Sequence, residues 1–299
     1  MNTVHVDPFA NLDVDHAVSS VSEDEEDEGL LTPSLLESKC KEHHGYRSPE
    51  LNEKLYLHHC KIRKLCPLDA YTNVRVLYLS GNSIQDLKPL APLVSLVSLY
   101  TSQNGLESLD SLPLLPQLTL LDVSYNQLEC LDVGEKLPKL ENLTAAHNSL
   151  RELTATKLEA FPHLQVLDIS FNQVDEEGTV WEELGKLTGL RTLMLHGNAA
   201  VRSLQHYRKH VIALLPELRF LDEYPVFEEE RQLAEAFASG GTDLENTVRQ
   251  QQQEAKAAAR ERQFSFFEET IKKVTRREEK KEPSQYLLDQ TDDIYIPNA

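Results

Sequence analysis

A repeated pattern along most of the chain restricts what it can fold into. Apolar residues recur at positions one, four, six and eleven of each copy, with Asn at position nine, as in Val74, Leu77, Leu79, Asn82 and Ile84. Position nine holds Cys60, Asn82, Asn104, Asn126, Asn148, Asn172 and Asn198, which are separated four times by 22 residues and then by 24 and 26. A single copy cannot bury its own apolar residues, so consecutive copies must stack on one another to form a core.

The residue types indicate how each copy folds. The apolar residues at positions four and six face inward from a short strand, because alternate side chains of a strand lie on opposite sides. The Asn falls in the following turn, where its amide satisfies backbone groups that no strand pairs. The segment that leads from this turn back to the next strand, as in Lys88-Pro89, is short and contains prolines, which favours 3₁₀ turns. The pattern predicts the α/β class, as a leucine-rich-repeat solenoid with a parallel concave sheet, helical caps and an extended C-terminal helix.

An open solenoid exposes apolar side chains at both ends, so we expect a cap at each. Thr32-Pro33 combines an N-cap residue with Pro at the first helical position, which predicts a helix to about Lys41 within an N-terminal cap, residues 30–50. The repeats and a second cap, 207–222, occupy residues 51–223. The apolar residues available for sealing are Leu35, Leu36 and Cys40 at one end and Tyr207, Val211, Leu214, Leu215, Leu218 and Leu221 at the other.

Two terminal segments lack the composition of a packed core. Residues 1–29 contain nine Asp or Glu and no Lys or Arg, which predicts a disordered acidic tail. Ser20 and Ser22 precede the acidic run, so the tail is either a target of an acid-directed kinase or a solubilising segment. Residues 282–299 are expected to form a flexible tail.

Residues 224–281 are expected to form a helical extension. A first helix should end at Gly240-Gly241, and residues 242–281 contain no Pro or Gly, which predicts a long exposed helix. The residues on one of its faces are Phe264, Phe267, Ile271 and Val274. This stripe either docks a partner or packs against the solenoid of the same chain.

The residues beside the buried leucines face the concave side, where we expect partners to bind. The candidates are Tyr56, His58, Tyr78, Tyr100, Asp122, Tyr125, His147, Asp168, Phe171 and Met194. Tyr supplies apolar area and a hydroxyl, and Asp can meet Arg or Lys. The alternative is that Tyr is simply tolerated on a strand surface. Seven strands about 4.8 Å apart span roughly 30 Å, which suits one helix or one extended segment.

Other functional classes find no support in the sequence. A formal net charge of −19 argues against nucleic-acid binding, which requires clustered Lys and Arg. The longest apolar stretch, Leu87 to Leu99, is interrupted by prolines and is too short for a membrane span. The spacing of the four cysteines gives no CxxC pair, and no phosphate loop, nucleophile motif or HExxH occurs. We therefore expect no catalysis, cofactor or metal.

Several segments carry a family resemblance. Leu51 to His58, and the Pro225-Val226-Phe227 segment with Gly240-Gly241, resemble the leucine-rich-repeat dynein axonemal assembly factor family. The resemblance implies a non-catalytic scaffold for pre-assembly of dynein arms, located in the cytoplasm and in the cilium or flagellum. It implies axonemal dynein subunits or co-chaperones as partners. The 22-residue repeat also occurs in a regulatory subunit of protein phosphatase 1 and in structural ciliary and spliceosomal proteins, which are the alternative functions.

Overall fold

A computed structural model describes residues 29–133, 137–151, 161–175 and 180–279 of the chain. These residues form two compact units. The first contains the repeats up to Gln205 together with Leu215–Pro225, and the second contains His206–Leu214 and the residues from Val226 on. The acidic tail, apart from Gly29, and the C-terminal tail predicted from the sequence lie outside the described residues.

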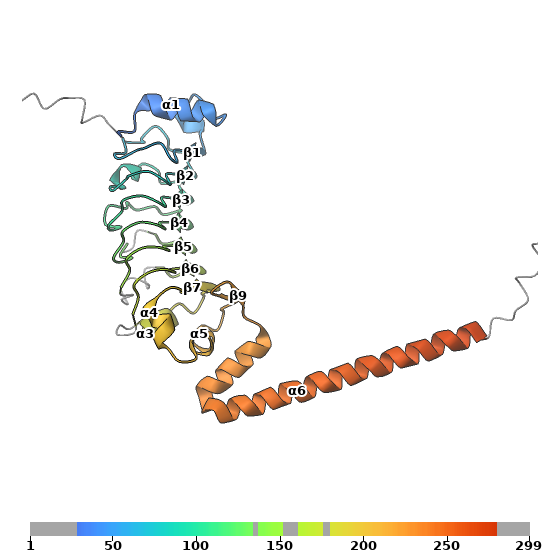
Figure 1. Ribbon diagram of the computed structural model, residues 1–299. Helices are drawn as coiled ribbons and strands as arrows, with labels where there is room; N and C mark the ends of the chain where they lie inside the picture. Colours follow the sequence, from blue (N-terminus) through green and yellow to red (C-terminus); the bar gives the residue numbers. More distant parts are fainter. Residues whose placement is uncertain (1–28, 134–136, 152–160, 176–179, 280–299) are drawn as a thin grey trace, which may run out of the picture. The chain divides into compact units, whose positions relative to one another are not determined.

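The first unit contains one sheet whose strands follow one another in chain order (Figure 1). The strands are β1 (Lys54–Tyr56), β2 (Val76–Tyr78), β3 (Ser98–Tyr100), β4 (Leu120–Asp122), β5 (Asn142–Thr144), β6 (Val166–Asp168), β7 (Thr192–Met194), β8 (Phe220–Leu221) and β9 (Tyr224–Pro225). From β1 to β8 neighbouring strands are parallel, and the central leucine of each of β1 to β7 is buried beside the next. The predicted leucine-rich-repeat solenoid is confirmed.

The side of the coils away from the strands contains short helical turns. Among the described residues these are the 3₁₀ turn η2 (Lys88–Leu90) and the helices α3 (Val180–Gly185) and α4 (Ala199–Ser203), whereas the 3₁₀ turn η1 (Pro49–Leu51) lies just before β1. The 3₁₀ turn at Lys88 follows from its prolines and the short coil, as expected. Helix α3 lies in the longer coil, where additional residues leave room for an α-helical turn, and Val180 and Leu184 are buried there.

The asparagines at position nine join each coil to the preceding one. Oδ1 of Asn126 accepts a hydrogen bond from the Leu106 amide at 3.1 Å, and its Nδ2 donates to the carbonyls of Thr101 and Val123 at 3.1 and 2.9 Å. In the first coil, Oδ1 of Asn82 accepts from the amides of both Cys60 and Ile62 at 3.0 Å. These bonds satisfy turn groups that the sheet leaves unpaired.

Helix α1 (Pro33–Glu42) covers the β1 end of the first unit (Figure 1). The Thr32 side chain accepts a hydrogen bond from the Leu35 amide at 3.2 Å, which is the N-cap expected from the sequence. Leu36 and Cys40 are buried, whereas Leu35 is only half-buried. The Gly29 carbonyl accepts a hydrogen bond from the Arg63 amide at 2.7 Å, which ties the segment before α1 to the first coil.

The other end of the sheet is closed by β8 and β9, which form an antiparallel pair. Oδ1 of Asp222 accepts hydrogen bonds from the amides of Leu195 and His196 at 2.7 and 2.9 Å. Leu215, Leu218 and Leu221 are buried in this unit. The segment expected to form a single cap is divided, because α5 (Tyr207–Leu214) groups with the second unit.

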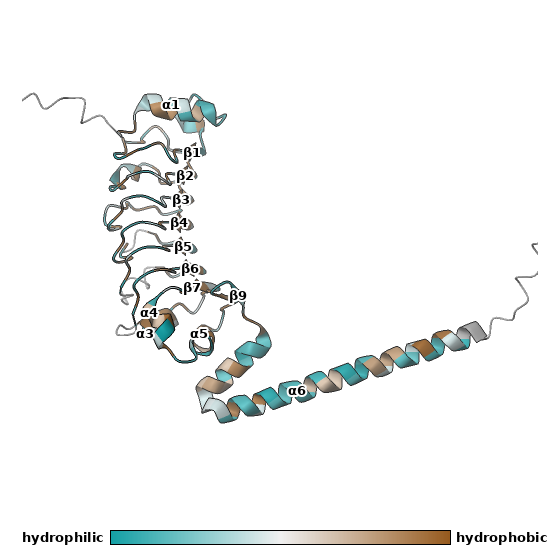
Figure 2. Ribbon diagram, in the orientation of Figure 1, coloured by the Kyte–Doolittle hydropathy of each residue, from teal (hydrophilic) through white to brown (hydrophobic). Residues whose placement is uncertain are grey.

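The second unit consists of α5 and α6 (Glu228–Glu279). Helix α6 is interrupted where the sequence predicts, at Gly240 (φ −145°) and Gly241 (φ 67°, ψ −156°). An ion pair between Lys209 and Glu245, 2.6 Å long, joins α5 to the arm after this break. The predicted stripe Phe264, Phe267, Ile271 and Val274 is exposed, and Figure 2 shows hydrophobic residues among hydrophilic ones toward the end of α6.

Candidate protein-binding surface

Three tyrosines form a stack on the exposed face of the sheet. The parallel register places Tyr56, Tyr78 and Tyr100 beside one another at the ends of β1, β2 and β3. Their ring centroids are 4.9 and 4.8 Å apart and the planes deviate from parallel by 6° and 7°. Because strands in a sheet are about 4.8 Å apart, identical residues in successive coils stack without distortion. We call these three residues the tyrosine ladder.

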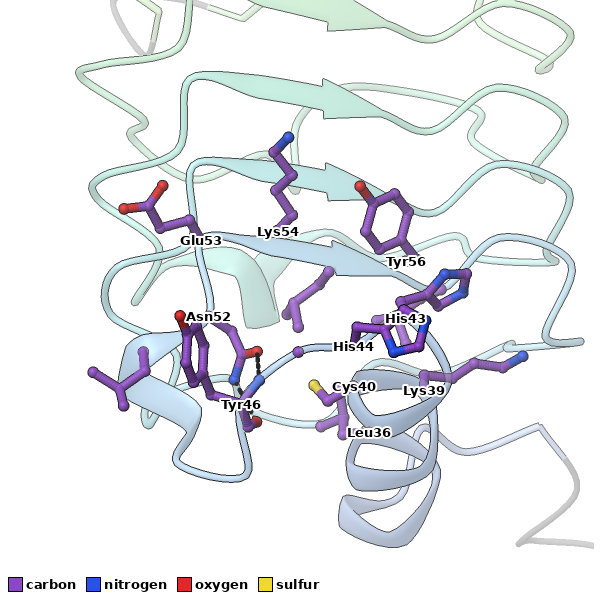
Figure 3. Close-up of a pocket in the computed structure, with 14 residues that line it drawn as sticks. Leu36, Lys39, Cys40, His43, His44, Tyr46, Asn52, Glu53, Lys54 and Tyr56 are labelled. Carbon is purple, nitrogen blue, oxygen red and sulfur yellow. Dashed lines mark hydrogen bonds between the residues drawn. The ribbon is translucent and has the colours of Figure 1, made fainter.

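His43, just after α1, extends the tyrosine ladder by one ring. Its imidazole lies 4.6 Å from the Tyr56 ring, and the His58 ring lies edge-on to Tyr56 at 6.4 Å. A pocket of about 600 Å³ adjoins these rings, lined by the end of α1, the following turn and β1 (Figure 3). The Asn52 side chain holds this turn by accepting from the Tyr46 amide and donating to the Tyr46 carbonyl. His43 was not anticipated from the sequence, because it lies outside the repeat.

The Tyr100 hydroxyl remains a hydrogen-bond donor at neutral pH. Partial burial, together with the neighbouring Tyr78 and Asp122, raises the pKa of Tyr100 above its ordinary value. A phenol already has an ordinary pKa near 10, so the neutral form dominates. The tyrosine ladder therefore presents apolar ring surface with hydroxyls that both donate and accept.

A second stack lies beyond the ends of strands β4 to β6. The rings of Tyr125, His147 and Phe171 stack at 4.3 and 4.4 Å, and His196 meets Phe171 edge-on at 4.9 Å. We call Tyr125, His147 and Phe171 the mixed aromatic ladder. All three have left-handed backbone conformations, with φ of 54°, 55° and 52°. The sequence predicted these residues on the binding face, but neither their stacking nor their backbone conformation.

Two aspartates complete the exposed sheet face. Oδ1 of Asp122 accepts from the amide and the hydroxyl of Ser124 at 3.0 and 2.7 Å, and Oδ1 of Asp168 accepts from Ser170 at the same distances. Both carboxylates are half-buried and fixed by these bonds. Met194 occupies the same repeat position on β7, opposite Asp168 in the register. The strand register thus brings together the candidates at the fifth position of the repeat, as the periodicity requires.

The described residues offer neither a metal centre nor a membrane span. Among them, His, Cys, Asp and Glu form no group of three or more suited to hold a metal ion. None of the helices in these residues combines the length and apolar character that a membrane crossing requires. The described sheet face instead presents aromatic rings and carboxylates side by side.

Comparison with known sequences defines the class of protein. Residues 72–114 match the family model described as leucine-rich repeats in two copies, and residues 162–179 match a further leucine-rich-repeat model. The chain is therefore a leucine-rich-repeat protein, in agreement with the sheet and the position-nine asparagines.

The individual relatives carry names that refer to leucine-rich repeats or to dynein assembly. The chain is 48% identical over 222 residues to leucine-rich repeat-containing protein ODA7 of Chlamydomonas reinhardtii. It is 55% identical over 222 residues to human dynein axonemal assembly factor 1 and 54% identical over 231 residues to the mouse protein. These alignments cover 74%, 74% and 77% of this chain. The resemblance to the dynein axonemal assembly factor family is confirmed, and the chain spans 51% of the algal, 30% of the human and 36% of the mouse relative.

Proposed function

We propose that this protein is a non-catalytic scaffold for the cytoplasmic pre-assembly of axonemal dynein arms. The observation that carries the proposal is the identity of 54% to 55% with relatives named dynein axonemal assembly factor 1, over most of this chain. The aligned length is great enough to include the greater part of the repeats. The proposed partners are axonemal dynein subunits or co-chaperones, and the proposed locations are the cytoplasm and the cilium or flagellum.

The tyrosine ladder is the proposed site for a client segment. Tyr56, Tyr78 and Tyr100 are half-buried, so their rings are already held in place before a partner arrives. A rigid aromatic surface loses little side-chain entropy on binding, which is why tyrosine is common at binding hot spots. The scaffold would hold one client segment while dynein subunits fold or join, without any bond being made or broken.

Removal of the protein from a motile, ciliated or flagellated cell tests the proposed function. We expect such cells to build cilia or flagella that beat poorly and lack dynein arms in electron micrographs. Dynein heavy chains should also fall in the cytoplasmic extract, because the defect precedes transport. Normal arms together with a normal cytoplasmic pool of heavy chains would contradict the proposal.

Purification of the tagged protein from the same cells separates the alternatives. Recovery of dynein subunits or co-chaperones supports the assembly role. Stoichiometric recovery of a phosphatase catalytic subunit would instead favour a regulatory subunit of protein phosphatase 1. Recovery with extracted axonemes or with spliceosomal particles, in place of soluble dynein, would favour a structural component.

A further inference from the structure

We propose that the mixed aromatic ladder, with Asp122 and Asp168, binds a basic amphipathic helix that carries two Lys or Arg residues seven positions apart. This inference rests on the proposed function and names the chemistry of a second client segment. It differs from the tyrosine ladder in its coils, since its residues belong to the coils of β4 to β6, and Asp122 lies beside Tyr100 at the boundary between the two surfaces.

The backbone conformation of the mixed aromatic ladder carries a free-energy cost. Tyr125 and Phe171 are 52% and 49% exposed, so they contribute little to the core. Both have positive φ, a conformation that is unfavourable for bulky residues and that Gly adopts freely. Other coils place Gly81 and Gly197 at the same repeat position, also with positive φ. Exposed rings at a position where glycine suffices indicate a surface that contacts another molecule.

Two carboxylates give the surface beside the mixed aromatic ladder a negative charge. Asp122 and Asp168 each direct Oδ1 to a serine, and within the part of the chain that the structure describes no Lys or Arg pairs with either carboxylate. Stacking covers the faces of Tyr125, His147 and Phe171 against one another, so the mixed aromatic ladder presents apolar ring edges beside these carboxylates. Carboxylates and apolar ring edges side by side complement a segment that is both basic and apolar.

The distance between the two aspartates favours a helical partner. Asp122 and Asp168 pair with the same residue of β5, Thr144, from opposite sides, so they are two strands and about 9.6 Å apart. In a helix lying across the strands, residues i and i+7 are on one face and about 10.5 Å apart. In an extended segment, same-face residues are about 6.7 or 13 Å apart, neither of which matches. The spacing therefore selects a helix over an extended segment.

Binding of synthetic helices to the full chain tests the inference. The probe is a fluorescent amphipathic peptide of about 21 residues, with Leu along one face and Arg at positions 7 and 14 of that face. A matched peptide carries Glu at these two positions. We expect the arginine peptide to bind at least about tenfold more tightly, with a difference that shrinks as salt rises.

Paired variants locate the binding site. Asp122→Asn with Asp168→Asn removes both charges but keeps the Oδ1 acceptor for each serine, so the fold should remain intact. We expect this variant to lose about tenfold in affinity for the arginine peptide. Tyr125→Asn with Phe171→Asn removes both exposed rings and should also lose about tenfold in affinity. Asn is chosen because it tolerates the positive φ of these two positions, so the backbone should be preserved. The control, Tyr56→Ala with Tyr78→Ala, leaves Tyr100 beside Asp122 and should change this affinity by less than about twofold.

Three results would overturn the inference. They are equal binding of the two peptides, no measurable binding of either, and unchanged affinity in the double Asn variant of the aspartates. Each is distinguishable from failure of the proposed function. Normal dynein arms with a normal cytoplasmic pool of heavy chains in cells lacking the protein reject the proposed function whatever the peptides do, whereas equal peptide binding with missing arms rejects only this inference.

Discussion

At the scale of single residues, each position-nine asparagine acts as a hydrogen-bonded tie between two coils. Asn126 and Asn148 are buried, and each bonds backbone groups of its own coil and of the coil before it. Side-chain amides are suited to this place because one group supplies both a donor and an acceptor. The requirement explains why Asn recurs at a fixed spacing that the sequence shows directly.

Replacing Asn126 by Ala should lower the free energy of unfolding by about 1–3 kcal/mol, because the buried Leu106 amide loses its acceptor. The measurement is chemical denaturation of the full chain. Gln127→Ala is the control, since Gln127 is exposed and its loss should change stability by less than about 0.5 kcal/mol. Equal denaturant midpoints for Asn126→Ala and the parent would show that the asparagine bonds contribute nothing.

Glu245 should make the α5–α6 unit sensitive to acid. A hydrogen bond from Lys209 is the main cause that lowers the pKa of Glu245, and Arg249 adds to it. A carboxyl whose pKa is lowered by folding stabilises the folded state above its ordinary pKa, about 4.3, and this contribution disappears as pH falls through the lower folded value. The protection factors of the amides around Glu245, which are corrected for the intrinsic slowing of exchange in acid, should therefore fall below about pH 4.3.

Glu245→Gln tests the cause of this acid sensitivity. The variant should show faster exchange already at neutral pH and a weaker dependence on acid, because the charge is absent at every pH. Glu254→Gln, at an exposed position of the same helix, should behave like the parent. Identical pH profiles for Glu245→Gln and the parent would rule out the assigned role of Glu245.

At the scale of elements, the sequence predicts what is local and periodic. Strands β1 to β7, the N-cap of α1 and the break in α6 each follow from residues close together in the chain, so they could be located in advance. Contacts between segments far apart in the chain could not be located from the sequence. His43 meets Tyr56 from outside the repeat, and α5 groups with α6 through ion pairs such as Lys209–Glu245. Neither contact leaves a periodic signal.

Gly241 should be the residue that keeps α6 divided. Its φ of 67° and ψ of −156° lie in a region that is essentially restricted to glycine, so Gly241→Ala should cost about 1–3 kcal/mol or continue the helix through the break. A Cβ there would meet no atom within 4 Å, so any effect is conformational. Gly189→Ala is the control, because that site is equally open and has no positive φ.

The measurement for Gly241→Ala is the distance between spin labels placed on the two arms of α6. A longer distance would show that the helix continues through the break, and an unchanged distance with lower thermal stability would show that the break is kept at a cost. Both results agree with Gly241 as the residue that keeps α6 divided. An unchanged distance and unchanged stability would mean that the break is determined elsewhere.

At the scale of the whole molecule, the repeat predicts the solenoid and the segments around it indicate the family, both of which are confirmed. The candidate surface was only partly accessible to sequence reasoning. The fifth-position residues could be placed because they alternate with buried leucines. The mixed aromatic ladder required knowledge of backbone dihedrals after each strand, and these depend on the turn rather than on residue type. Phe266, 72% exposed, lies off the predicted stripe of α6 and was missed for that reason.

Rescue of dynein arms by a tyrosine-ladder variant tests the central claim most directly. In cells lacking the protein, re-expression of the parent or of Tyr46→Ala with Tyr224→Ala, two exposed tyrosines outside the ladder, should restore the arms. Tyr78→Ala with Tyr100→Ala should not, at equal expression and melting temperature, because binding should weaken by more than about 2 kcal/mol. Full restoration of the arms by this ladder variant would contradict the claim that the client binds there.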